Sequence, residues 1–176
     1  EEKEMLNDSW ILHLDSFEWE CVSFNMTSPR TGASAVIVNR SVYIFGGHGA
    51  DGKYFSDLHC VDLNKRIVKN LDFIQNHPSE RSNATMFKTK ESIFIWSGYN
   101  GTTLTDMHEY NIYDKKWTKC DNPGIEGRRI GLYASNTDGT FQYALCSQPS
   151  GSEVLKFDPE SKKIMIIPCV GHKPHG

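Results

Sequence analysis

The sequence lacks the long apolar runs and the short motifs that would point directly to a membrane helix or a nucleotide-dependent enzyme. No run approaches the roughly 18 apolar residues that a membrane helix needs. The GxSxG, GxGxxG and P-loop patterns are absent, so nucleophilic and nucleotide chemistry have no sequence support. A formal net charge of −3 over 176 residues gives no support for binding to nucleic acids or anionic membranes. The length suits one domain with a real hydrophobic core.

The cysteines are few, odd in number and widely spaced, without CxxC or CxxH pairs. They are Cys21, Cys60, Cys120, Cys146 and Cys169. This pattern argues against a zinc site and against a dense disulfide framework, so we expect reduced thiols and a cytoplasmic protein. N-glycosylation sequons, among them those that begin at Asn25, Asn39, Asn83 and Asn100, favour the alternative, a secreted protein.

The seven histidines do not form a metal-binding pattern, and we expect neither a metal nor another cofactor. His48, His59 and His108 lie in or beside expected strands, and no helical i, i+4 pair is present. The stretch "FGGHGADG" is rich in glycine, but it joins two strands and lacks the helix N-terminus with which such loops bind phosphate. Tyr43 and Cys60 offer the Tyr–Cys pair of a copper oxidase, yet nothing selects them over the other tyrosines.

What the sequence does contain is an internal repeat of 49 residues. Three columns recur at that interval: Asp8, Asp57 and Asp106; Leu12, Val61 and Tyr110; Trp19, Val68 and Trp117. Three columns in register over two intervals identify a repeat architecture, which decides the fold. The chain then divides into residues 1–29, the tail of a first unit, and complete units at 30–80 and 81–127. Residues 128–176 form a fourth, degenerate unit.

Each complete unit predicts four short strands. In the second unit, "SAVIV" (34–38) is β-branched, "SVYIF" (41–45) alternates, and "DLHCVDL" and "IVKNL" follow after a polar loop. No helical period is long enough to cover a sheet. Four strands in about 48 residues are typical of propeller blades. The first unit supplies only its outer strands and the chain begins without Met, so we expect a fragment of a larger propeller, with the remaining blades supplied by flanking sequence or another chain.

The spacing within the units resembles that of Kelch repeats. An arginine opens a unit, apolar strands end in a glycine pair, and Asp or Asn precedes Trp by six residues. The matching residues are Arg30, Gly32, Gly46, Gly47 and Asp62; then Arg81, Gly98, Tyr110, Asn111 and Trp117; then Arg129, Gly131, Phe157 and Asp158. The resemblance covers essentially the whole chain and implies an all-β Kelch-type propeller segment of four-stranded antiparallel blades, about three and a half in number.

The glycines of this pattern lack a Cβ and so leave space on the sheet for another group to approach the backbone closely. We expect an indole from the outermost strand to lie flat on exposed backbone at Gly46, Gly47 and Gly98. Trp19 and Trp117 occupy the position from which such an indole would come. Trp117 is therefore predicted to be largely buried.

The resemblance implies a protein-interaction module without enzymatic activity. In Kelch propellers that bind acidic peptides, arginines at the start of each blade point into the central pocket, so Arg30, Arg81 and Arg129 are candidate ligands for carboxylates. Loops on a rigid β scaffold commonly carry recognition, and aromatic side chains dominate interface energies. The candidate contacts in those loops are His48, Tyr54, Phe55 and Tyr99. Two alternatives stay open: a Kelch enzyme of sugar-modifying or copper-oxidase type with its catalytic groups in other blades, and an extracellular adhesion segment.

Overall fold

The structure is a computed structural model, which describes residues 5–22, 24, 28–71, 75–126, 136–137, 141–146 and 153–168; for 136–137 and 146 it describes the backbone only. All regular structure in these residues is β, without a helix. Within the same residues there is accordingly no helix that could cross a membrane.

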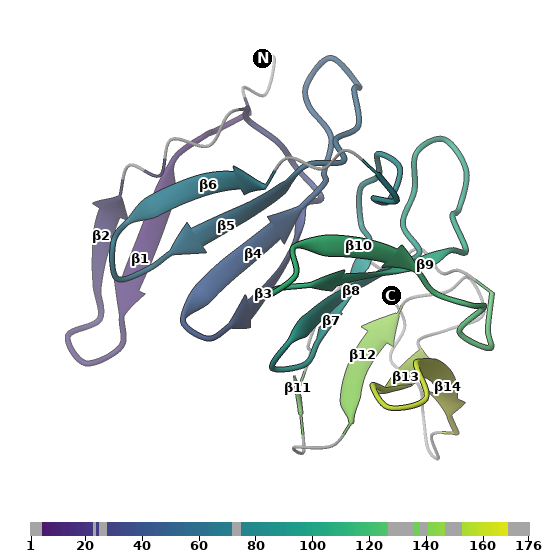
Figure 1. The fold of residues 1–176 in the computed structure, drawn as a ribbon. Coiled ribbons are helices and arrows are strands. Elements are labelled where there is room, and N and C mark those ends of the chain that lie inside the picture. The colour runs from purple at the N-terminus through teal and green to yellow at the C-terminus, as the bar shows by residue number, and fades with distance from the viewer. Residues whose placement is uncertain are drawn as a thin grey trace.

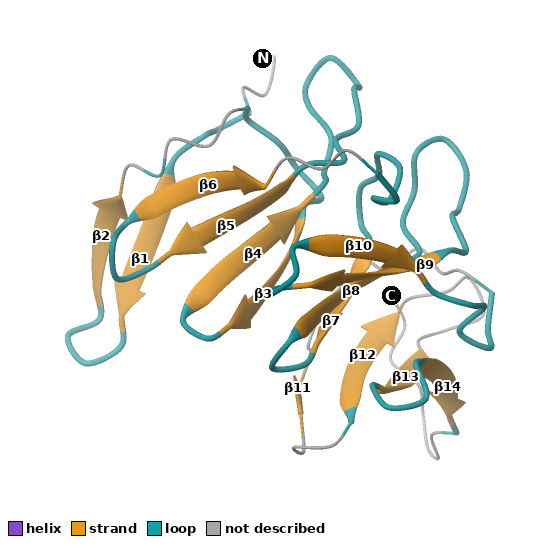
Figure 2. Cartoon of the chain, in the orientation of Figure 1, coloured by secondary structure: helices purple, strands orange, loops and turns teal. Residues whose placement is uncertain are grey.

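The strands form four antiparallel sheets, which we number 1 to 4 in chain order (Figures 1 and 2). Sheet 1 contains β1 (Ser9–His13) and β2 (Glu18–Val22). Sheet 2 contains β3 (Ser34–Val38), β4 (Ser41–Phe45), β5 (Leu58–Asp62) and β6 (Ile67–Leu71). Sheet 3 contains β7 (Thr85–Lys88), β8 (Ser92–Trp96), β9 (Met107–Asn111) and β10 (Lys116–Lys119). Sheet 4 contains β11 (Asn136–Thr137), β12 (Gln142–Cys146), β13 (Glu153–Asp158) and β14 (Lys163–Ile167).

Within each four-stranded sheet the strands lie side by side in chain order. The sheets follow one another around an arc, each tilted relative to the last (Figure 1). Consecutive pairing by short turns is the topology of a propeller blade, so the sequence-based prediction of an all-β chain built from four-stranded antiparallel blades is confirmed. In sheet 2, β3, β4 and β6 have the predicted bounds. Buried and exposed residues alternate along β3, as expected for a strand with one face in the core.

Two apolar clusters hold neighbouring sheets together. The first joins Val36, Tyr43, Phe45 and Leu58 of sheet 2 to Met86, Ile93, Ile95, Tyr110 and Trp117 of sheet 3. The second joins Phe87, Phe94, Trp96 and Met107 of sheet 3 to Ala144, Leu155, Phe157 and Ile164 of sheet 4. Sheet 3 therefore buries both of its faces. All five residues of β8 are buried, since this strand lies in the middle of the described molecule.

The tryptophans of one sequence column occupy opposite environments. Trp117 is 4% exposed and packs against Tyr110 of its own sheet and Phe45 of sheet 2, with ring centroids 5.1 and 6.2 Å away. Its predicted burial is confirmed. Trp19 is 65% exposed, because no described sheet covers the corresponding face of the β1–β2 hairpin. The prediction that Trp19 would pack as Trp117 does is therefore wrong for the described chain.

The glycines serve a different purpose from the predicted one. A Cβ on Gly46 would lie 2.3 Å from the carbonyl oxygen of Arg81, and the Gly47 N–H donates to that same oxygen at 2.9 Å. A Cβ on Gly98 would lie 3.0 Å from the Ser82 carbonyl oxygen. Most of the atoms nearest to these positions belong to the segments that lead into β3 and β7, one is the Phe55 carbonyl oxygen of the β4–β5 loop, and none belongs to an indole. Because these glycines have no Cβ, the segment that leads into the next sheet can approach their backbone closely.

Candidate functional site at the loop end

One end of the described molecule gathers the segments that connect strands and sheets. The β4–β5 loop (residues 46–57) and the β8–β9 loop (97–106) extend from the same end of their sheets, and the crossing from β6 to β7 passes beside them (Figure 1). We call this region the loop end and define it by residues 46–57, 75–84 and 97–106. The turns of the β1–β2, β5–β6 and β9–β10 hairpins lie at the other end.

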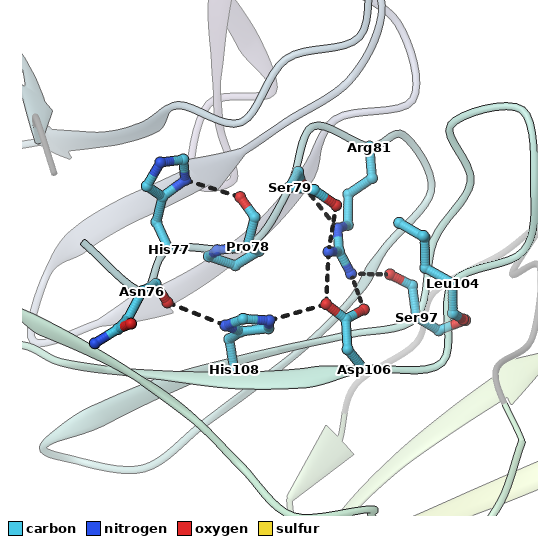
Figure 3. Close-up of polar contacts among 9 residues, drawn as sticks. All are labelled: Asn76, His77, Pro78, Ser79, Arg81, Ser97, Leu104, Asp106 and His108. Atoms are coloured by element: carbon cyan, nitrogen blue, oxygen red, sulfur yellow. Dashed lines mark hydrogen bonds and ion pairs between the residues drawn. The ribbon is translucent and has the colours of Figure 1, made fainter. Parts of the chain in front are cut away.

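Arg81 is enclosed at the base of the loop end (Figure 3). Its side chain is 0% exposed. Two of its nitrogens donate to the two carboxylate oxygens of Asp106, at 2.7 and 2.9 Å. The remaining hydrogen bonds go to the Ser97 carbonyl and to the carbonyl and hydroxyl of Ser79. A guanidinium has five N–H donors, and each of the five has an acceptor here.

The same arrangement recurs one repeat earlier. Arg30 donates to both carboxylate oxygens of Asp57, at 2.6 and 2.8 Å, and to the carbonyls of Gly46 and Ser28. Gly46 and Ser97 occupy the same place in their sheets, since the N–H of each donates to the carbonyl of its sheet's aspartate. Each arginine therefore fastens the first strand of a sheet to the loop before its third strand.

These contacts correct the interpretation of Arg30 and Arg81 as ligands for an acidic peptide. Their donors are taken up within the protein, and the aspartates have already neutralised their charge. Moving either guanidinium to a ligand would leave a partly buried carboxylate without its partner, which is costly. Arg129, the third arginine of the column, lies outside the described residues. The described arginines are therefore structural, and we call the pairs Arg30–Asp57 and Arg81–Asp106, with the groups bonded to them, the two clamps.

Each clamp also contains a histidine that sequence analysis did not connect to it. His108 Nε2 is 2.8 Å from Asp106, and His108 Nδ1 is 3.1 Å from the Asn76 carbonyl oxygen in the crossing between sheets (Figure 3). His59 Nε2 is likewise 2.8 Å from Asp57. The available signal was Asp–x–His, which recurs at the repeat interval as residues 57–59 and 106–108.

The clamp holds its aspartates in the ionised form. Burial raises the pKa of Asp106, but hydrogen bonds from His108 and Arg81 lower it by more, so the pKa lies well below the usual range. The pKa of Asp57 is lowered by the equivalent partners against the same effect of burial. Because such shifts are also produced by structural ion-pair networks, they do not by themselves indicate catalysis.

An aromatic cluster crosses the loop end from sheet 2 to sheet 3. The rings of His48 and Tyr54 are 5.8 Å apart between centroids, and those of Tyr54 and Tyr99 are 6.4 Å apart in an edge-on arrangement. All three side chains are partly exposed. The sequence-predicted residues His48, Tyr54 and Tyr99 are thus brought together by two loops that lie 49 residues apart in the repeat.

Phe55, the fourth predicted loop residue, has a structural place. The Arg30 guanidinium lies over its ring at 4.3 Å from the centroid, and its carbonyl accepts a hydrogen bond from the Arg81 N–H at 2.9 Å. A cation over an aromatic face is stabilising. Phe55 therefore supports the loop and links sheet 2 to the start of sheet 3, while the other three aromatic residues form the partly exposed cluster.

The described residues offer no group of three or more His, Cys, Asp or Glu side chains that is placed to hold a metal. Tyr43 and Cys60 do lie opposite each other on β4 and β5, where burial raises the pKa of Tyr43. The copper-oxidase alternative needs histidines gathered around this pair, and the described part of the chain does not supply them.

Comparison with known proteins agrees with this geometry. The model of the KLHDC2/KLHL20/DRC7 Kelch-repeats domain matches residues 1–131. The chain belongs to the Kelch-repeat family. Members of this family typically mediate protein–protein contacts and are generally non-enzymatic. The match covers sheets 1 to 3, so both arginine clamps lie within the Kelch-repeat region.

Three relatives illustrate how widely this Kelch segment is shared. Ras guanine nucleotide exchange factor F of Dictyostelium discoideum is 26% identical over 92% of this chain and 16% of its own length. Acyl-CoA-binding domain-containing protein 5 of Arabidopsis thaliana is 25% identical over 61% and 18%. Human Kelch domain-containing protein 10 is 27% identical over 73% and 30%. The matched region therefore spans less than a third of each of these relatives.

Proposed function

We propose that this Kelch segment binds a protein partner at its loop end, through the cluster formed by His48, Tyr54 and Tyr99. The observation that carries the proposal is the contact between Tyr54 and Tyr99, which joins the loops of two blades into one partly exposed aromatic surface. Tyrosine is enriched among the residues that dominate protein interfaces. It presents a large area at a low cost in conformational entropy.

The framework below the cluster supports this role because it fixes both loops. Arg30 and Arg81 anchor the bases of the two loops through Asp57 and Asp106. Backbone hydrogen bonds join His48 to Thr31 and Tyr99 to the residue that follows Arg81. A surface held in place before binding loses less conformational freedom when a partner arrives.

The proposal does not require an acidic partner. That expectation rested on three arginines, and the two described ones are saturated by aspartate and carbonyl acceptors. An aromatic surface instead favours a partner segment with apolar or planar side chains and hydrogen-bonding groups for the tyrosine hydroxyls.

A quantitative pull-down tests the proposal directly. Three baits are used: the wild-type chain, a Tyr54→Ala/Tyr99→Ala double variant and a Tyr113→Ala control. The proteins bound to each bait are compared by quantitative mass spectrometry with isotope labelling. Tyr113 is exposed in the β9–β10 turn, at the opposite end of the blade. We expect partners that are lost with the double variant and retained with the control. Partners that bind all three baits equally would refute a loop-end interface.

We propose that the protein functions in the cytoplasm. Cys21, Cys60 and Cys120 are free in the structure, which supports a reducing compartment. Mass spectrometry of the native protein tests this assignment. Glycans on Asn25, Asn39, Asn83 or Asn100 would contradict it.

A further inference from the structure

Two loops of the loop end carry, at equivalent positions, dipeptides that are prone to backbone rearrangement. By the 49-residue repeat, Asp51–Gly52 in the β4–β5 loop corresponds to Asn100–Gly101 in the β8–β9 loop. Both glycines are exposed and have positive φ, and a Cβ at either position would have no atom within 4 Å. A glycine after Asp or Asn leaves the backbone nitrogen between them unhindered, so that it can attack the side-chain carbonyl carbon.

Hydrogen bonds restrain the Asp51 site. The Gly52 N–H donates to the Gly49 carbonyl at 3.0 Å, so the nitrogen that would have to attack is already engaged. One carboxylate oxygen of Asp51 accepts a hydrogen bond from the Lys53 N–H, also at 3.0 Å. A carboxylate is in addition a poorer electrophile than a carboxamide. The first of the two sites is therefore protected by the local structure.

The Asn100 site has no such restraint. In the part of the chain that the structure describes, neither the Gly101 N–H nor the Asn100 carboxamide has a hydrogen-bond partner. Asn100 is held only through its backbone N–H, which donates to the Thr102 carbonyl at 3.2 Å. Its side chain is partly exposed, so water can reach it. No other asparagine in the sequence precedes a glycine.

We propose that Asn100 is a site of spontaneous deamidation. The Gly101 nitrogen attacks Asn100 Cγ, a new C–N bond forms, the Cγ–Nδ2 bond breaks, and ammonia leaves with the proton of the Gly101 N–H. Water then opens the cyclic imide at either of its carbonyls and leaves aspartate or isoaspartate at this position. The net reaction consumes one water and releases one ammonia, without oxidation or reduction.

Deamidation would alter the surface formed by His48, Tyr54 and Tyr99. Either product places a negative charge on the residue that follows Tyr99, and isoaspartate also lengthens the backbone by one methylene before Gly101. The Tyr99 backbone exchanges two hydrogen bonds with Ser82, each at 2.9 Å, so the position of its ring depends on backbone next to the modified residue. We therefore expect deamidation to weaken partner binding. This consequence rests on the proposed function, whereas the modification itself does not.

Peptide mapping by liquid chromatography and mass spectrometry measures the conversion of each asparagine after incubation of the complete chain at neutral and at mildly alkaline pH. We expect Asn100 to convert first and to give both products. Conversion should be faster at the higher pH, because the attacking nitrogen must lose its proton. Asn64 is the internal control: it is exposed in the β5–β6 turn, but it precedes Lys65, whose N–H donates to Asp62 at 3.0 Å. Conversion of Asn100 no faster than that of Asn64 would overturn the proposal.

Asp51→Asn tests the role of the hydrogen bonds, because it places a second Asn–Gly dipeptide at the equivalent position of the neighbouring loop. We expect this site to convert several-fold more slowly than Asn100 in the same molecule, since the Gly52 N–H is bonded to the Gly49 carbonyl. Equal rates at the two sites would show that the dipeptide alone decides the reactivity, contrary to the structural argument.

The effect on binding is measured by ageing the baits of the pull-down. Wild type and Asn100→Gln are incubated side by side, because glutamine forms the corresponding imide far more slowly. Capture of loop-end partners by wild type should fall in proportion to the converted fraction, and capture by Asn100→Gln should stay constant. Undiminished capture by converted chain, with partners still lost in the Tyr54→Ala/Tyr99→Ala variant, would refute the effect on binding and leave the proposed function standing. Conversion without any partner that depends on these tyrosines would refute the proposed function and leave the modification shown.

Discussion

Replacing Arg81 by methionine should destabilise the protein strongly, because it removes the guanidinium of an enclosed clamp. Arg81 is fully buried and all five of its donors are used, two of them on Asp106. Methionine retains much of the apolar stem, so the change isolates the head group. Removing one partner of a buried ion pair costs about 3–5 kcal/mol, because the other charge is left without compensation. We expect a loss within this range, since His108 alone would then hold Asp106.

The matched control is Lys162→Met, which breaks an ion pair between neighbouring blades that is more exposed. Lys162 Nζ lies 2.6 Å from Glu109, and its side chain is 44% exposed. Exposed pairs contribute about 0–1 kcal/mol, so this variant should be close to wild type. Urea unfolding followed by tryptophan fluorescence gives the free energies of unfolding. Arg81→Lys should recover only part of the loss, because an ammonium lacks the planar fork. A loss below about 1 kcal/mol for Arg81→Met would refute the clamp.

Three further predictions follow from burial, backbone contact and charge. Trp117→Ala should lower the free energy of unfolding by about 3–5 kcal/mol, and a change below about 1 kcal/mol would contradict its place between the blades. Gly46→Ala should be more harmful than Gly52→Ala by about 1–3 kcal/mol: both glycines have positive φ, but only at Gly46 would a Cβ meet a carbonyl oxygen, while Gly52 has open space. The pKa of Asp106 is lowered in the folded protein, so its contribution to the free energy of unfolding should be fully present above the unfolded-state pKa of about 3.9. This contribution should be lost as the pH falls through the folded-state pKa. Acid titration of Asp106→Asn should show a shallower loss than wild type, and identical curves would argue against the shift.

The sequence was sufficient for the repeat and the strands, because both follow from local pattern. The β-branched run "SAVIV" and the alternation in "SVYIF" predicted β3 and β4 to the residue. The predicted burial of Trp117 was correct, but the reason given for it was wrong, because the indole packs against Tyr110 and Phe45 and the glycines contact backbone instead. The prediction for Trp19 failed because burial there depends on a neighbouring blade, which the repeat pattern of this chain does not provide.

The arginines and glycines show what a one-dimensional pattern does not contain. The columns of Arg30 and Arg81 and of Asp57 and Asp106 were both visible in the sequence. Their spacing, 27 and 25 residues, gave no sign that the side chains meet. The glycine pair correctly indicated a close approach at Gly46, but the approaching group is a carbonyl of the next blade. Pairing of side chains across loops depends on the three-dimensional path of the chain.

The most direct test of the account is the affinity of a purified partner for three forms of the chain. Isothermal titration calorimetry would compare wild type with Tyr99→Ala, at the centre of the proposed interface, and with Tyr113→Ala, at the opposite end of the same blade. We predict that Tyr99→Ala weakens binding by about tenfold or more, the effect of losing an interface residue worth at least roughly 1.4 kcal/mol, and that Tyr113→Ala binds as wild type does. Equal affinities for wild type and Tyr99→Ala, or a loss confined to Tyr113→Ala, would contradict the assignment of the loop end as the binding surface.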